Sequence, residues 1–151
     1  MDNIDIKILR ILQHNARISA SDISSNVNLS LSSVGERIKK LENSGIIKQY
    51  TTIIDGLSLG KELTALMYVR LEQPQFTEGF IKFIDKEDEI LECHYIAGEY
   101  DYIIKIITKN TFALEKLLTK IKGRAGVVKT NTNIVLSTIK NNYSVSPDKD
   151  G

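Results

Sequence analysis

The period of the apolar pattern changes once along the chain, at residues 55–60. Before this segment, apolar residues recur every three or four positions, as they do in amphipathic helices. After it, short apolar runs alternate with helical spacing, as in a mixed α+β domain. The segment itself contains two glycines and no periodic pattern of apolar residues, which indicates a linker. We therefore predict a helical domain at 1–54, a linker at 55–62, an α+β domain at 63–140 and a flexible polar tail at 141–151.

Three helices are expected in the first domain, with a short link between the second and third. The first has apolar residues at positions 4, 8, 11 and 12. Ser19 and Asp22 have the spacing of an N-cap and its acidic partner, so the second helix begins there and is expected to bury Ala20. Asn28 accepts the left-handed conformation that ends a helix, and Ser30 can cap the third helix. This is the layout of a helix-turn-helix, in which the last helix enters the major groove of DNA.

The third helix, at about 30–44, has an apolar stripe at Val34, Ile38 and Leu41 and a polar face opposite it. Small hydroxyl groups early in a helix suit contact with base edges, and lysines late in it suit contact with phosphates. A small helical bundle would expose the same face to water, so the pattern alone leaves both interpretations open. Under the first interpretation the DNA-binding residues are Ser30, Ser32, Ser33, Glu36, Arg37, Lys39 and Lys40. Residues 46–54, rich in Ile, Thr and Tyr, are expected to form two short extended pieces, which predicts a winged helix-turn-helix.

Strands and helices alternate in the second domain. Strands are expected at 63–72, 90–97, 102–108 and 127–139, and helices at 75–87 and 111–122. This order, βαββαβ, is the ferredoxin-like arrangement, and the whole chain is therefore predicted to be α+β. The third strand is apolar on both sheet faces. Since two helices cover only one face, the other is expected to meet a second copy of the chain across a two-fold axis, which would also pair two DNA-binding helices.

The loop at 97–101, between the two central strands, is the strongest candidate for a small-molecule site. Gly98 allows a sharp turn that exposes backbone amides, while Glu99 and Asp101 can meet an ammonium group. Together these groups suit the two ends of an amino-acid zwitterion, although a Gly-Glu-Tyr-Asp loop is also a common turn. The candidate effector residues in the loop are Gly98, Glu99, Tyr100 and Asp101.

Composition and charge exclude several classes of protein. With 42% hydrophobic and 26% charged residues the chain is a core-forming protein, and its net charge of +1 means that any attraction to DNA is local. The sequence shows neither an apolar stretch of about 20 residues nor a signal peptide, so we expect a cytoplasmic location and no membrane contact. Cys93 is expected to be a buried small hydrophobe. Because it neighbours His94 in a strand, the two side chains point to opposite faces and cannot act as nucleophile and base. We expect no enzyme, no catalytic residue, no metal and no cofactor.

A series of residues in order resembles the leucine-responsive and asparagine-responsive family of transcription regulators, the Lrp/AsnC or feast/famine family. In the first domain the series comprises Asp5, Ile8-Leu9, Asn15-Ala16-Arg17, Leu29-Ser30, Val34, the run 37–47 and Leu59-Gly60. In the second domain, residues 98–102 resemble the effector-loop signature of the family. Residues 130–132 and 134–136 resemble its last strand, which adds Thr132 to the candidate effector residues.

This resemblance implies a sequence-specific regulator that binds double-stranded DNA and senses an amino acid or related metabolite. It also implies homodimers that assemble into octamers with the effector between dimers. Asn28 and Ala97 depart from the glycine and threonine that are frequent in the family at these places. Gly35, inside the third helix, costs about 1 kcal/mol relative to alanine, and it is either a neutral position or one that lets the helix approach DNA closely. An effector-independent, chromatin-like architectural DNA-binding protein is the alternative function.

Overall fold

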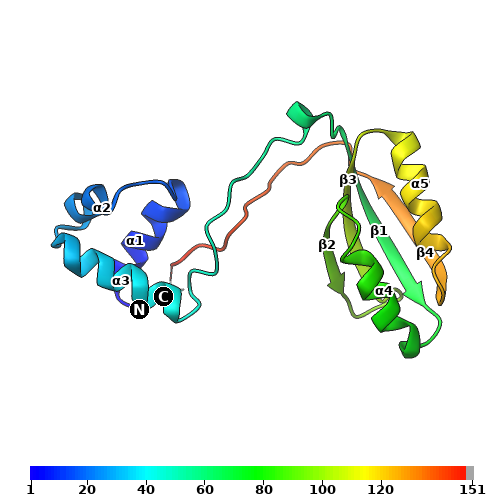
Figure 1. Ribbon diagram of the computed structural model, residues 1–151, viewed down its shortest axis with the longest axis horizontal. Helices are drawn as coiled ribbons and strands as arrows, with labels where there is room; N and C mark the ends of the chain where they lie inside the picture. Colours follow the sequence, from blue (N-terminus) through cyan, green and yellow to red (C-terminus); the bar gives the residue numbers. More distant parts are fainter. Residues whose placement is uncertain (149–151) are drawn as a thin grey trace. The chain divides into compact units, whose positions relative to one another are not determined.

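The computed structural model describes residues 1–148 and divides the chain into two compact units (Figure 1). The first, called here the helical unit, contains residues 1–53 and 140–148 of the described chain. The second, called the sheet unit, contains residues 54–139. The polar tail thus belongs with the N-terminal helices, although it follows the sheet in the sequence.

Three helices form the helical unit: α1 (Asn3–His14), α2 (Ala20–Val27) and α3 (Leu31–Asn43). Their caps are those expected from the sequence. Ser19 Oγ accepts the backbone N–H of Asp22 at 3.0 Å. Ser30 Oγ accepts the N–H of Ser33 at 3.2 Å, and Asn28 takes the left-handed conformation with φ 53°. Because these signals are local, they set the short link between α2 and α3 that defines a helix-turn-helix.

One residue from each helix supplies the centre of the small apolar core of this unit. Ile8, Ile23 and Val34 are almost completely buried and belong to one cluster. The expectation that Ala20 is buried was wrong, since it is exposed. As the first residue of α2, Ala20 lies at the end of the buried stripe that Ile23 continues into the helix.

Residues 46–54 form neither helix nor strand. The two expected extended pieces therefore do not pair with each other, and a short strand without a partner leaves its backbone groups unsatisfied. The segment is instead tied to α3. The N–H groups of Ile46 and Ile47 donate to the carbonyl oxygen of Leu41 at 3.0 and 3.1 Å. The Tyr50 hydroxyl donates to Glu42 Oε1 at 2.9 Å.

The tail returns to the exposed side of α1. The Gln13 side-chain amide donates to Ser144 Oγ at 2.8 Å and to the carbonyl oxygen of Val145 at 2.7 Å. Arg10 forms an ion pair with Asp148. Residues far apart in the sequence thus complete the helical unit.

The sheet unit has the predicted βαββαβ order, and the ferredoxin-like arrangement is confirmed (Figure 1). Its four-stranded antiparallel sheet has the strand order β2-β3-β1-β4. The elements are β1 (Leu63–Leu71), α4 (Thr77–Ile84), β2 (Ile90–Tyr95), β3 (Tyr102–Thr108), α5 (Thr111–Lys122) and β4 (Val127–Ile134), with the short 3-10 turns η1 (Leu57–Leu59) and η2 (Pro74–Phe76).

Four elements of the sheet unit are shorter than expected: β1 and β2 end one and two residues early, β4 ends five residues early, and α4 begins two residues late and ends three residues early. β4 ends at Ile134, which lies opposite Ala65, because its partner strand β1 begins only two residues earlier at Leu63. α4 begins later than expected because Pro74 opens a 3-10 turn before it. None of these changes alters the order of the elements.

The two faces of the sheet differ in what covers them. On one face, Met67, Ile104 and Ile106 are fully buried in a cluster with residues of α4 and α5. Figure 1 shows both helices on this side. On the other face, called here the open face, Tyr68 and Ile103 lie side by side in the β1–β3 register and are half-buried. The predicted apolar character of both faces is therefore present, with helices over only one of them.

Candidate nucleic-acid interface and effector loop

The outer face of α3 is accessible over its whole length. Ser32, Glu36, Lys39 and Lys40 are all exposed, and Gly35 lies among them. A Cβ placed on Gly35 would meet no atom within 4 Å. α3 therefore presents a polar ridge with hydroxyl groups near its start and two ammonium groups near its end.

The hydroxyl groups at the start of α3 form a small network. Ser30 Oγ lies 3.0 Å from Ser32 Oγ and 2.8 Å from Ser33 Oγ. Since Ser30 also caps the helix, its oxygen is largely committed to the fold. Ser32 is exposed, whereas Ser33 is half-buried. Of the three, Ser32 is thus the best placed to contact another molecule.

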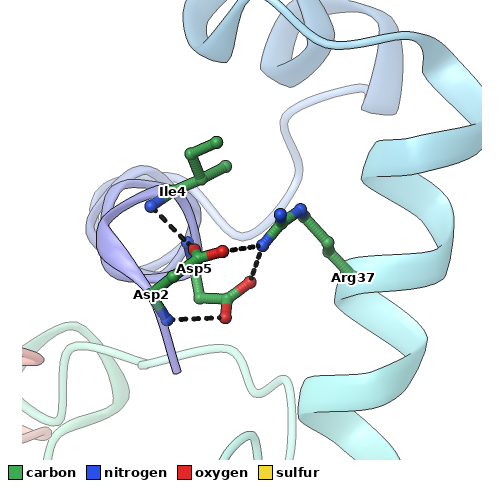
Figure 2. A network of polar contacts seen from close by, with 4 residues as sticks. All are labelled: Asp2, Ile4, Asp5 and Arg37. Atoms are coloured by element: carbon green, nitrogen blue, oxygen red, sulfur yellow. Dashed lines mark hydrogen bonds and ion pairs between the residues drawn. The ribbon is translucent and has the colours of Figure 1, made fainter.

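Arg37 differs from the other candidates because it points back into its own unit (Figure 2). Its Nη1 donates to Asp2 Oδ2 and to Asp5 Oδ1, both at 2.7 Å. Asp2 and Asp5 form the capping box of α1, and Asp5 is buried. The guanidinium therefore joins α3 to the start of α1, which places Arg37 apart from the exposed ridge.

The electrostatics of this network favour its charged form. The N–H of Asp5 and then the Arg37 guanidinium hold the pKa of Asp2 below its usual value. Burial opposes ionisation of Asp5, but the N–H of Asp2 and Arg37 outweigh it, so the pKa of Asp5 is also lowered. The two carboxylates raise the pKa of Arg37 in turn.

Leu31 is a feature of this surface that the sequence reasoning missed. It is the first residue of α3 and 56% of its side chain is exposed, beside the serine network. An apolar side chain there can contact the methyl group of thymine in the major groove. Its spacing to Val34, Ile38 and Leu41 places Leu31 on the same apolar stripe, so the sequence alone gives no signal of its exposure at the start of the helix.

The effector loop, residues 97–101, is held to the sheet by its own backbone. Gly98 has φ 151°, a conformation that residues with side chains rarely adopt. The N–H of Ile96 donates to the carbonyl oxygen of Asp101 at 2.8 Å, and Asp101 N–H donates to the carbonyl oxygen of Val69 at 3.0 Å. Asp101 Oδ2 accepts the N–H of Leu71 at 2.7 Å. One oxygen of this carboxylate is thus used to fasten the loop to β1.

Glu99 and Tyr100 turn toward the open face. Glu99 Oε1 lies 2.5 Å from Lys129 Nζ, and this contact lowers the pKa of Glu99. The Tyr100 ring packs against Tyr68 with ring centres 5.5 Å apart. Thr132 does not join them, because it pairs with the buried Met67 and so lies on the helix-covered face. Within one chain, the loop and Thr132 are therefore on opposite sides of the sheet.

Cys93 and His94 lie on the edge strand β2, and both are exposed. The expectation that Cys93 is buried was wrong, because β2 is an edge strand of the sheet and pairs only with β3. The register places Cys93 opposite Ile104 and His94 opposite Ile103, hence on different faces, as expected. Among the described residues no group of three or more acidic, histidine or cysteine side chains is arranged to hold a metal ion. None of the helices in the same range is long and apolar enough to span a membrane.

A helix-turn-helix with an exposed polar third helix, followed by a ferredoxin-like unit with an anchored loop, defines a DNA-binding transcription regulator with a ligand-binding domain. Comparison with known proteins identifies the family. Residues 1–48 match the model of the winged helix-turn-helix DNA-binding domain, and residues 64–145 match that of the Lrp/AsnC ligand binding domain. The chain belongs to the Lrp/AsnC family of transcription regulators, as the sequence series predicted. Because that family is not enzymatic, the expectation of no enzyme is confirmed.

Individual relatives cover nearly the whole chain. The HTH-type transcriptional regulator FL11 of Pyrococcus horikoshii is 39% identical over 140 residues, which are 93% of this chain and 92% of the relative. The leucine-responsive regulatory protein of Haemophilus influenzae is 36% identical over 143 residues, 93% and 86% of the two chains. A transcriptional regulator of Neisseria meningitidis, solved as a complex with L-Met, has a TM-score of 0.91 at 31% identity and covers 96% of both chains.

Proposed function

We propose that this regulator binds a preferred DNA site through the outer face of α3 and changes its activity when an amino acid or related metabolite binds at the effector loop. The observation that carries the DNA half is the exposed ridge of Ser32, Glu36, Lys39 and Lys40 on a helix whose opposite face is buried. The effector half is supported by the anchored loop at 97–101 and by the L-Met complex of the Neisseria meningitidis relative.

The residues on α3 have different roles in this proposal. Ser32 and Glu36 read base edges, because they lie in the first two turns of the helix. Lys39 and Lys40 neutralise phosphates. Ser30 and Ser33 shape the start of the helix through the hydroxyl network. Arg37 acts through Asp2 and Asp5, by fixing the angle between α3 and α1.

Titration of the full chain with a selected high-affinity duplex and with random duplexes at several salt concentrations tests this assignment. We expect Lys40→Ala to weaken binding to every duplex and to reduce the slope of log affinity against log salt by about 0.9, the value for one phosphate contact. Ser32→Ala should change the preference among sites and leave the slope unaltered. Lys116→Ala, an equal change of charge on α5, is the matched control. A specificity ratio near one in the wild type would replace this proposal with the architectural alternative.

We also propose a homodimer that pairs the open faces of two sheets. Tyr68 and Ile103 are half-buried there without a helix above them, and a second copy would complete their burial. The proposed contact leaves uncovered the end of the face at which the exposed Arg70 and Lys129 lie. Ile103→Lys is expected to yield monomers in light scattering, whereas Ile81→Lys, the same change at an exposed position of α4, is not. The same measurement with and without amino acids tests assembly into octamers. A monomeric wild-type protein would remove the dimer.

A screen of the twenty amino acids by thermal shift tests the effector half. A ligand that binds only the folded state raises the melting temperature, by an amount that grows with its concentration above Kd. If no amino acid raises it, the effector role of the loop loses its support.

A further inference from the structure

The end of the open face next to the effector loop carries more cations than anions. Arg70 on β1 lies directly opposite Lys129 on β4, and both side chains are exposed. Like charges directly opposite each other destabilise a pair of strands, so this arrangement has a cost. Glu99 forms an ion pair with Lys129, whereas Arg70 has no hydrogen bond or ion pair with any residue in the range 1–148. Two cations thus share one carboxylate.

Aromatic surface borders these charges. Lys129 Nζ lies 5.4 Å from the centre of the Tyr100 ring, which in turn packs against Tyr68. Arg70 acts on the same carboxylate without bonding to it, since its charge adds to the lowering of the pKa of Glu99 that Lys129 mainly causes. The loop therefore brings together a free guanidinium, a paired ammonium, one carboxylate and a ring surface.

We propose that Arg70 and Lys129 form the carboxylate subsite of the effector site, and that Glu99 is an intramolecular stand-in for the effector carboxylate. This inference rests on the amino-acid sensing proposed above and names the residues that select its ligand class. Without effector, Glu99 neutralises Lys129. When an amino acid binds, its carboxylate pairs with both cations and displaces Glu99.

The displaced Glu99 then accepts the ammonium group of the same amino acid. The exchange keeps the number of charges constant, and every charge of the zwitterion gains a partner, as does Arg70. A guanidinium suits this task because its planar fork can bind a carboxylate through two parallel hydrogen bonds. The site therefore selects ligands that carry a carboxylate and an ammonium group on one carbon atom, and a simple amine lacks the group that displaces Glu99.

The test uses calorimetric titration of the full chain with whichever of the twenty L-amino acids raises the melting temperature most. Arg70→Gln and Lys129→Gln are each expected to weaken its binding by at least about tenfold, the size of one lost charge-assisted hydrogen bond. Lys82→Gln removes the same charge from an exposed position of α4, where Lys82 pairs with Glu78, and should change affinity by less than about twofold, as surface substitutions usually do. The ligand-free melting temperature of each variant verifies that it folds.

A second titration isolates the role of Glu99. The probe is the carboxylic acid that has the same side chain as that amino acid but lacks its amino group. Glu99→Gln should bind this acid more tightly than the wild type does, because the competing carboxylate is gone. The ratio of its affinity for the amino acid to its affinity for the acid should be lower than in the wild type, because the partner of the ammonium group is gone. Weaker binding of the acid by Glu99→Gln would overturn the stand-in role.

The outcomes separate this inference from the function on which it rests. If no amino acid binds the wild type, the proposed sensing itself fails and the subsite falls with it. If an amino acid binds wild type and Arg70→Gln equally well, the sensing stands and the subsite is refuted. A change in oligomeric mass of Arg70→Gln at unchanged amino-acid affinity would assign Arg70 to the contact between copies and would also refute the subsite.

Discussion

Replacing Gly35 with alanine should have opposite effects on stability and on DNA binding. Gly35 lies in the interior of α3, and an added Cβ would meet no atom within 4 Å. The full propensity difference between glycine and alanine, about 1 kcal/mol, should therefore appear as added stability. For a unit of this size, about 1 kcal/mol corresponds to a rise of about 4–8 °C in melting temperature. Because no described residue requires glycine at this position, Gly35 is either a neutral position or one that allows the close approach of DNA, and the second interpretation is the one to test.

Under this interpretation the new methyl group of Gly35→Ala lies between α3 and the DNA. An ill-fitting methyl in a packed contact costs about 1–3 kcal/mol, so the affinity for the preferred duplex should fall at least about fivefold. Gly79→Ala is the matched control, because Gly79 is exposed in α4 and an added Cβ meets nothing there either. It should stabilise the sheet unit and leave DNA binding unaltered.

Scanning calorimetry and duplex titration at fixed salt measure the two effects on the same preparations. A gain in stability with no loss of DNA affinity would refute the close approach and make Gly35 a neutral position. A loss of stability in Gly35→Ala would refute the structural premise itself, which is that the outer side of α3 is open at this residue.

Three further outcomes are expected. Arg37→Gln should destabilise the helical unit without changing the salt slope of DNA binding, and a reduced slope at unchanged stability would return Arg37 to the DNA-facing surface. The pKa values of Asp2 and Asp5 are lowered in the folded state, so their ionised forms stabilise the fold above the usual carboxyl pKa near 4, and this stability is lost as the pH falls through the folded-state values. Asp5→Asn should therefore make the melting temperature depend less on pH in the acidic range. Gly126→Ala should cost about 2–5 kcal/mol, because Gly126 has φ 85° and its Cβ would lie 2.2 Å from Phe76, whereas Gly60→Ala, with φ 68° and open space, should cost only the backbone strain of about 1–2 kcal/mol. Equal losses from the two glycine variants, measured by urea denaturation, would exclude the clash.

The features that the sequence predicted well depend on neighbouring residues. Ser19, Asn28 and Ser30 mark the ends of α2 and α3 because caps and left-handed turns act within four residues. The βαββαβ order follows in the same way from the period of each segment. Local rules of this kind predict the helix-turn-helix and the α+β class without information on contacts between elements.

The features that it missed depend on contacts between distant segments. Arg37 is indistinguishable from Lys39 and Lys40 as a basic residue on α3, and only its pairing with Asp5 separates it from them. Cys93 was expected in the core because the order of strands in the sheet, which makes β2 an edge, is not a local property. The opposite faces of Thr132 and the effector loop likewise depend on the register between β1 and β4.

The return of the tail to α1 has a consequence for how the chain is made. During synthesis α1 emerges early, but Ser144 and Asp148, which contact it, emerge only after the entire sheet unit. The helical unit is therefore begun first and completed last, because α1 lacks these partners until the end of synthesis. A released chain that ends before residue 144 should therefore keep the residues of the sheet unit and of the three helices, while the outer surface of α1 lacks its contacts with Ser144 and Asp148.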